Sequence, residues 1–273
     1  PTAVAQDVSP VPSIVATPTN LVIPGKMVWA DLLTTDVAAA SAFYRAVFGW
    51  EVVASEDPGY LTAMIDGRPV AAIASYEDEV PEDAEGLWLP SFSVQDVDAA
   101  MARAVKAGGR ELAPAENLPG RGRLAVLQDP QGAVVGVLRA SSGDPADGGR
   151  PQAGAWLWPE IWAADPAAAT AYYQAVLELE AIVETDDSGM PHHILGSGNI
   201  ARATAIAIPV EGVEPNWLLY LMVDDLADAL RRTVANGGEI LLPPRAGEMD
   251  SVLAIIADPT GGVVALQQFG VKS

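Results

Sequence analysis

The stretch "MVWADLLTTDVAAASAFYRAVFGW", residues 27–50, decides the fold, because the chain repeats its pattern as "GAWLWPEIWAADPAAATAYYQAVLELE", residues 154–180. Both stretches contain a Trp, an acid two residues later, a further Asp and then an aromatic pair. Asp36 in the first copy corresponds to Asp165 in the second, a shift of 129 residues (165 − 36). A repeat of this length indicates two copies of one domain.

The same shift holds along the rest of both copies. It relates these further pairs: Asp96 with Asp225, Gly109 with Gly238, Asp129 with Asp258, and Gly132 with Gly261. We therefore expect two domains, residues 26–140 and 154–270, joined by a linker over 141–153 that is rich in Gly, Pro, Ser and Asp. Residues 1–25 are rich in Pro, Ser, Thr and Ala and show no period, so we expect a flexible N-terminal arm.

Each domain divides again into two similar quarters. "KMVWADLLTT" is typical of a strand, and "DVAAASAFYRAVFGW" of a helix with Asp36 as its N-cap and Gly49 at its end. A strand pair around Asp66-Gly67 follows, because Asp-Gly between apolar runs predicts a hairpin. Every quarter therefore reads strand–helix–strand–strand, with one further short strand, and the fold class is α+β.

The composition excludes several classes of protein. Half of the 273 residues are hydrophobic and the formal net charge is −21, which disfavours nucleic acid and anionic membrane surfaces as partners. No apolar run is long enough to span a membrane, so no membrane span is expected. There is no Cys, which removes disulfides, thiolate nucleophiles and thiolate metal sites. The acidic surface by itself is explained by solubility.

These motifs, in their order, resemble the vicinal oxygen chelate superfamily, which includes glyoxalase I, bleomycin-resistance proteins and extradiol dioxygenases. The likeness covers residues 27–269 and is greatest to two-domain, actinobacterial-type glyoxalase-like members. It implies tandem glyoxalase-like domains, each built of two βαβββ modules whose mixed sheet forms a cup that binds ligands on its concave face.

The resemblance also implies a divalent metal held by one His, Glu or Gln from the first and last strand of each module. The corresponding positions here are apolar or lack a ligating side chain. They are Trp29, Ala71–Ala74, Leu89 or Pro90, and Gly136 in the first domain, and Trp158, Ala203–Ile206, Leu218 or Leu219, and Ala265 in the second. The only two His residues, His192 and His193, are adjacent, so on a strand they would face opposite sides. We therefore expect no metal and no cofactor.

Alternation along the first strand of each domain puts a Trp and an acid on one face: Trp29 with Asp31 and Leu33, and Trp158 with Glu160 and Trp162. The further candidates for the cup lining are Trp88, Ser91, Arg123, His192, Tyr220, Met222 and Gln267. Arg121 and Arg123 in "PGRGRLAVL" are candidates to reach Asp31 or an acidic ligand. Two interpretations stay open, a ligand-binding wall and ordinary core packing.

The first function hypothesis is a metal-independent protein that binds a small aromatic or hydrophobic molecule in one or both cups. The alternative is a lyase or isomerase with a noncanonical site, in which Asp31 or Glu160 is the base. An interaction module with vestigial cups is a third possibility. The partner in the first two cases is a small molecule, and a homodimer stays open. Localisation also stays open between the cytoplasm and export to the periplasm or cell envelope, with the arm following a removed signal or lipoprotein segment.

Overall fold

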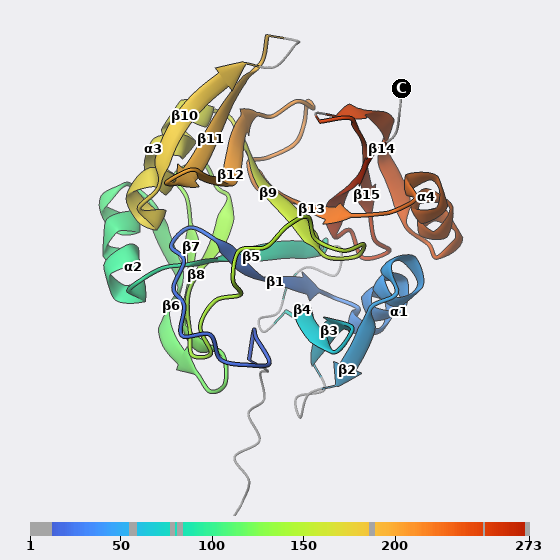
Figure 1. Ribbon diagram of the computed structural model, residues 1–273, viewed down its shortest axis with the longest axis horizontal. Coiled ribbons are helices and arrows are strands. Elements are labelled where there is room, and N and C mark those ends of the chain that lie inside the picture. Colours follow the sequence, from blue (N-terminus) through green and yellow to red (C-terminus); the bar gives the residue numbers. More distant parts are fainter. Residues whose placement is uncertain are drawn as a thin grey trace, which may run out of the picture.

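The computed structural model describes residues 13–54, 59–76, 80, 84–185, 189–247 and 249–270 (Figure 1). Within these ranges each half of the chain forms one eight-stranded mixed sheet with two helices. The prediction of an α+β protein made of two tandem domains is confirmed.

The first sheet contains the strands of the first half. They are β1 (Met27–Thr34), β2 (Glu51–Ala54), β3 (Tyr60–Ile65), β4 (Arg68–Ser75), β5 (Leu87–Ser93), β6 (Arg110–Leu118), β7 (Gly122–Gln128) and β8 (Val134–Ala140). Their order is β2-β3-β4-β1-β5-β8-β7-β6. The two first strands of the modules, β1 and β5, are antiparallel neighbours at the centre.

The second sheet repeats this arrangement. Its strands are β9 (Trp156–Ala163), β10 (Glu180–Thr185), β11 (Pro191–Ser197), β12 (Ile200–Ala207), β13 (Asn216–Met222), β14 (Glu239–Gly247), β15 (Ser251–Ala257) and β16 (Val263–Phe269). The order β10-β11-β12-β9-β13-β16-β15-β14 matches the first sheet strand for strand. Asp66 and Gly67 both have positive φ, 49° and 71°, which confirms the expected hairpin between β3 and β4.

One helix follows the first strand of each module. The helices are α1 (Val37–Phe48), α2 (Val97–Lys106), α3 (Pro166–Leu177) and α4 (Leu226–Ala235). Each begins after an Asp whose side chain accepts a backbone N–H from three residues further on, as Asp36 does from Ala39 at 2.9 Å. No helix in the described part of the chain is long and apolar enough to cross a membrane.

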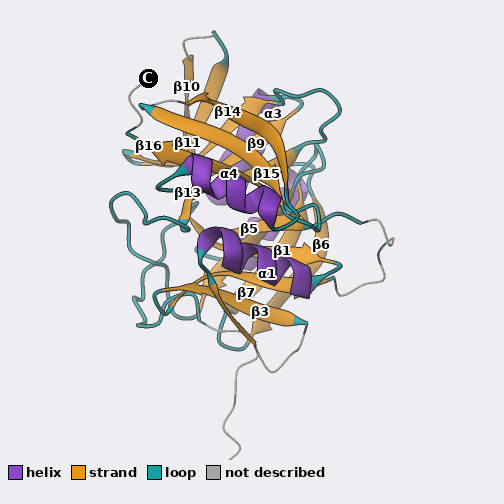
Figure 2. Cartoon of the chain, turned by 90° about the vertical axis from the view of Figure 1, so that its right-hand side faces the viewer, coloured by secondary structure: helices purple, strands orange, loops and turns teal. Residues whose placement is uncertain are grey.

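The helix-bearing faces of the two sheets are turned toward each other, so the halves share their core. Helix α1 packs against α4, as Figure 2 shows, and α2 packs against α3. One cluster joins Phe43 and Trp50 of the first half to Leu219 and Leu266 of the second. Because these convex faces meet, the concave face of each sheet, the inside of its cup, points away from the other half.

Residues 13–25 lie against the first half, and this attachment is not evident from the sequence. The Thr19 N–H donates to the Ser142 carbonyl at 2.9 Å, and the Gly25 N–H donates to the Ser93 carbonyl at 2.8 Å. Ile14 is only 4% exposed. The expectation of a flexible arm over residues 1–25 therefore does not describe residues 13–25, and residues 1–12 lie outside the described part.

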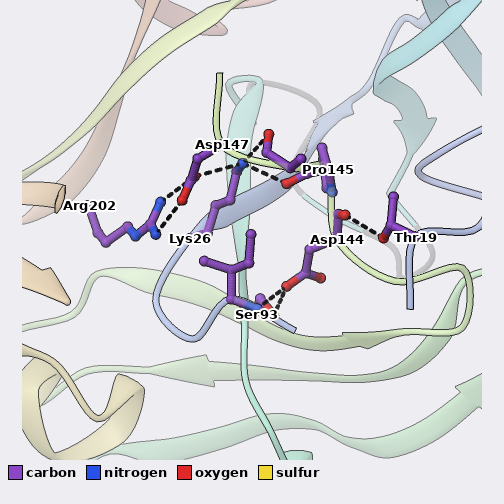
Figure 3. Close-up of polar contacts among 9 residues, drawn as sticks. Thr19, Lys26, Ser93, Asp144, Pro145, Asp147 and Arg202 are labelled. Carbon is purple, nitrogen blue, oxygen red and sulfur yellow. Dashed lines mark hydrogen bonds and ion pairs between the residues drawn. The ribbon is translucent and has the colours of Figure 1, made fainter. Parts of the chain in front are cut away.

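The linker is tied to both halves through Asp147 (Figure 3). Its carboxylate accepts from Lys26 Nζ at 3.0 Å and from both terminal nitrogens of Arg202 at 2.7 and 2.9 Å. Lys26 begins the first domain, whereas Arg202 lies on β12 of the second. Asp147 thus joins the start of one domain, the linker and the other sheet.

Candidate functional site

The central strand of each sheet presents a Trp and an acid to the inside of the cup. On β1, Trp29 packs in the concave cluster, whereas Ala30 and Leu32 pack in the core on the helix side. On β9, Trp158 and Trp162 lie in the concave cluster and Ile161 on the helix side. The acids two residues after Trp29 and Trp158 share their faces because side chains alternate along a strand.

In the first cup, Asp31 is held by two uncharged donors. Its Oδ1 accepts from Trp29 Nε1 at 2.9 Å and from the Tyr60 hydroxyl at 3.3 Å. Arg121 Nη2 donates to the same Tyr60 hydroxyl at 3.0 Å. The Arg121 guanidinium carbon also lies 3.6 Å from the centroid of the Trp29 ring, a cation–π contact. A cation, a phenol, an indole and a carboxylate are thus linked in one partly buried cluster.

In the second cup, Glu160 has an equivalent environment made from different residues. Its Oε1 accepts from Trp162 Nε1 and from the Tyr220 hydroxyl, both at 2.9 Å. Trp158 Nε1 donates instead to Thr204 Oγ1 on the neighbouring strand at 2.8 Å. Glu160 is 7% exposed. This cup therefore holds a buried carboxyl group between aromatic side chains.

Burial raises the pKa of both acids above their ordinary values. For Asp31 the nearby Arg121 charge and the hydrogen bonds from Trp29 and Tyr60 oppose the rise without cancelling it. For Glu160 the hydrogen bonds from Trp162 and Tyr220 are the largest effects that oppose the rise in its pKa. Both groups therefore bind a proton more readily than exposed carboxylates do, which suits proton exchange or hydrogen bonding with a ligand.

Comparison with known proteins identifies the family. A family model described as the Glyoxalase/Bleomycin resistance protein/Dioxygenase superfamily matches residues 26–137 and 157–266. The chain belongs to this superfamily. One relative, named "Putative glyoxylase CFP32", from Mycobacterium tuberculosis, is 31% identical over 87% of this chain and 92% of its own length. Another, the anthracycline biosynthesis protein DnrV of Streptomyces peucetius, is 33% identical over 80% of this chain and 84% of its own.

Solved structures of superfamily members share the fold. The Mn(II)-bound glyoxalase from Novosphingobium aromaticivorans has a TM-score of 0.63 at 17% identity, covering 91% of this chain and 83% of that one. The 2,3-dioxygenase LapB from Pseudomonas sp. KL28 has a TM-score of 0.59 at 15% identity, covering 96% and 94%. At these identities the likeness extends to the fold alone.

The residues at the superfamily's metal positions do not fit a divalent ion. In the first cup the positions that the resemblance implies are Trp29, Ala71–Ala74, Leu89 or Pro90, and Gly136, and none has a ligating side chain. A Cβ on Gly136 would collide with Ser91 Oγ, so a carboxylate there would require Ser91 to move.

The corresponding positions in the second cup are Trp158, Ala203–Ile206, Leu218 or Leu219, and Ala265, which offer only the hydroxyl of Thr204. In the described part of the chain, no three His, Cys, Asp or Glu side chains are grouped so that they could hold a metal. The superfamily's Lewis-acid chemistry therefore has no ligand set at these positions.

Two of the proposed lining residues lie on the wrong side of their sheet. Trp88 faces the helices, where its Nε1 donates to the Tyr44 hydroxyl at 2.8 Å. Arg123 forms a bidentate pair with Asp98 of α2, with bonds of 2.6 and 2.9 Å. Arg121, two residues earlier, is the arginine whose side chain lies in the first cup. It precedes β7, so the alternation of side chains along that strand does not put it on the same face as Arg123.

The other proposed lining residues are on the concave side. Ser91 pairs with Trp29 across β1 and β5, and Tyr220 pairs with Trp158 across β9 and β13. The charge of His192 is close enough to lower the pKa of Glu160. Met222 and Gln267 pair with each other at the end of the second sheet, where Gln267 Nε2 donates to Ser251 Oγ at 2.8 Å.

Three contacting residues are not among the lining residues that the sequence predicts. Tyr60 and Thr204 lie on strands beside the central one, and Ile14 comes from the arm. The sequence alignment of the two halves relates Tyr60 to His192, and the hairpin registers of β3–β4 and β11–β12 agree with it. No sequence signal places Ile14 over the cup.

Proposed function

We propose that the chain binds a small, flat aromatic molecule in its second cup and that it needs no metal to do so. The observation that carries this proposal is Glu160, a buried carboxyl on the concave face that is fixed by an indole and a phenol. Burying a carboxyl group costs free energy unless hydrogen bonds or an opposite charge replace its lost contacts with water. Ile14 of the arm packs in the concave cluster of the first cup, whereas no described residue of the arm packs in that of the second.

The side chains around Glu160 favour an aromatic ligand with a polar edge. Trp158, which is half-buried, lies in one aromatic cluster with the buried rings of Trp162 and Tyr220, and an aromatic ligand would stack against this cluster. Glu160, with its raised pKa, can donate to a ligand carbonyl when protonated, and it can accept from a ligand hydroxyl or ammonium when ionised. Fixed aromatic walls with one polar anchor are typical of small-molecule sites.

The relatives support the same ligand class. DnrV is named for anthracycline biosynthesis, and anthracyclines are flat polycyclic aromatic compounds. The superfamily's description includes bleomycin-resistance proteins. An anthracycline is therefore a suitable first probe for this chain.

The test is titration of daunorubicin into the protein, followed by its own fluorescence and by that of Trp. We expect saturable binding that weakens about tenfold, the worth of one strong polar contact, in Glu160→Gln or Tyr220→Phe. Glu239→Gln, an exposed acid on β14, is the matched control and should bind as the wild type does. Equal affinity in all four proteins would refute the second cup as the site.

The alternative is a lyase or isomerase in which Glu160 or Asp31 is the base, and the raised pKa of both acids favours it. The mycobacterial relative's name suggests the reaction to test, isomerisation of the adduct of methylglyoxal and a thiol. Thioester formation that Glu160→Gln abolishes while daunorubicin binding survives would support an enzyme. No thioester formation by the wild type would remove this alternative.

A further inference from the structure

The first cup contains an arginine that the fold itself does not require. Arg121 is 2% exposed, and the position related to it by the shift of 129 is Asp250. The second sheet forms with the same strand order, although no arginine stands there. A buried guanidinium is costly, and burial lowers the pKa of Arg121. This arginine is therefore better explained by what the first cup binds than by folding.

Two buried polar atoms in this cup have unused hydrogen-bonding capacity. Arg121 Nη1 and Ser91 Oγ have no hydrogen-bond partner among the described residues. Ser91 is 1% exposed and lies opposite Trp29, the ring on which Arg121 stacks. Native proteins rarely leave such atoms unsatisfied, because each costs about 1–3 kcal/mol. A ligand with acceptor oxygens would satisfy both.

One residue of the arm packs on the concave side of the first sheet. Ile14 packs with Trp29, Leu138 and Ala140, and Ser13 Oγ donates to the Gly120 carbonyl at 3.2 Å. Further along the arm, the Thr19 hydroxyl donates to the Asp144 carbonyl at 2.6 Å.

Space is available for this short segment to move. Residues 14–17 line one wall of a groove of about 730 Å³, whose other walls are the β3–β4 turn and the linker. The segment that carries Ile14 can therefore leave the cup while Thr19 and the residues after it stay attached.

We propose that the first cup is a site for a small organic carboxylate with an apolar body, and that Ile14 occupies it in the free protein. The carboxylate pairs with Arg121 Nη1, since a planar guanidinium suits a planar anion. The apolar body takes the place of Ile14 against Leu124 and Leu138. A ligand with a single negative charge fits best, because Asp31 lies in the same cluster and would repel a second negative charge on the ligand.

The test uses 2-naphthoate, with neutral 2-naphthamide as the matched ligand, measured by calorimetry on the full chain. Ile14→Ala should bind naphthoate about tenfold more tightly than the wild type, because the plug is shortened. Ile14→Ala should also prefer naphthoate to naphthamide by about tenfold. Adding Arg121→Gln should abolish that preference, whereas adding Arg123→Gln, which removes an exposed ion pair, should leave it intact.

Three results would overturn the proposal. They are the absence of naphthoate binding by Ile14→Ala, equal affinity for the two ligands, and a preference that survives Arg121→Gln. The comparison of the two ligands on Ile14→Ala decides the matter even if the arginine variant does not fold. Daunorubicin binding at the second cup is scored separately, so either proposal can fail without the other.

Discussion

In the second cup, Trp162 Nε1 lies 2.9 Å from Oε1 of Glu160, the residue two positions before it on the same strand. The first cup has the same bond in the opposite direction along the chain, because Trp29 donates to Asp31, two positions after it. Trp158, the repeat partner of Trp29, bonds to Thr204 instead. The two cups therefore share an indole bonded to an acid, but not the same indole.

This bond to a buried acid predicts a pH-dependent effect of Glu160→Gln. The folded-state pKa of Glu160 is raised above the unfolded value, so its protonated form stabilises the fold at low pH. That contribution is lost as the pH rises through the folded pKa, because the carboxyl group then becomes a buried charge. Glutamine stays neutral and can still accept from Trp162 and Tyr220.

We therefore expect Glu160→Gln to gain thermal stability relative to the wild type at pH 8 and to gain less at pH 5. Melting curves at both pH values measure the difference. Glu239→Gln, at an exposed position, should show no such trend. A gain that is the same at both pH values would mean that Glu160 is not a buried, charge-disfavoured group.

The packing of the shared core predicts that replacing Gly238 with any larger residue destabilises the fold. A Cβ there would lie 2.6 Å from Phe43 Cε2 and 2.7 Å from the Ala257 carbonyl. Since Phe43 belongs to the other half, Gly238→Ala should weaken the packing between the halves and cost about 1–3 kcal/mol. Chemical denaturation measures the loss.

The linker supplies the matched control for that substitution. At Gly148 the added Cβ meets nothing within 4 Å, so Gly148→Ala should be nearly neutral. Equal stability of the two variants would show that the halves are not packed as described.

The ion pairs of Asp147 predict that Asp147→Asn loosens the linker from both halves. Hydrogen bonds from Arg202 lower the pKa of Asp147 most, with a further contribution from Lys26. Its stabilisation is therefore present above the unfolded pKa of 3.8 and lost as the pH falls. Because the Asp147 side chain is 35% exposed, we expect a loss of only about 1 kcal/mol at neutral pH.

Faster proteolytic cleavage of the linker is the more sensitive measurement of this variant. Asp98→Asn, which breaks the exposed pair with Arg123, is the control and should leave the cleavage rate unchanged. A cleavage rate for Asp147→Asn that matches the wild type would contradict the proposed fastening role.

Much of the fold could be predicted because its signals are local. Asp caps, Gly stops and the repeat shift locate the helices and the hairpin at Asp66-Gly67. The face of each side chain is harder to predict, since a one-residue error in register reverses it. The sequence places Trp88 and Ser91 together inside the cup, yet they stand three residues apart on one strand and so face opposite sides.

Other parts of the site depend on contacts that no local pattern encodes. Ile14 reaches the first cup through a segment without periodicity. Arg121 and Arg123 are two residues apart, but Arg121 belongs to a turn, so only the three-dimensional path of the chain tells their roles apart. The positions that correspond to the superfamily's metal ligands are easier to locate from the sequence. The internal repeat and the spacing of the family's motifs both assign them to the same strands.

The most direct test of the central claim combines metal analysis with binding after chelation. The metal content of the untreated protein is measured by mass spectrometry. Daunorubicin is then titrated by calorimetry before and after the protein is treated with a strong chelator. We predict far less than one metal ion per chain and an affinity equal to that of the untreated protein. Stoichiometric divalent metal, with binding that is lost on chelation and restored on reloading, would contradict the account.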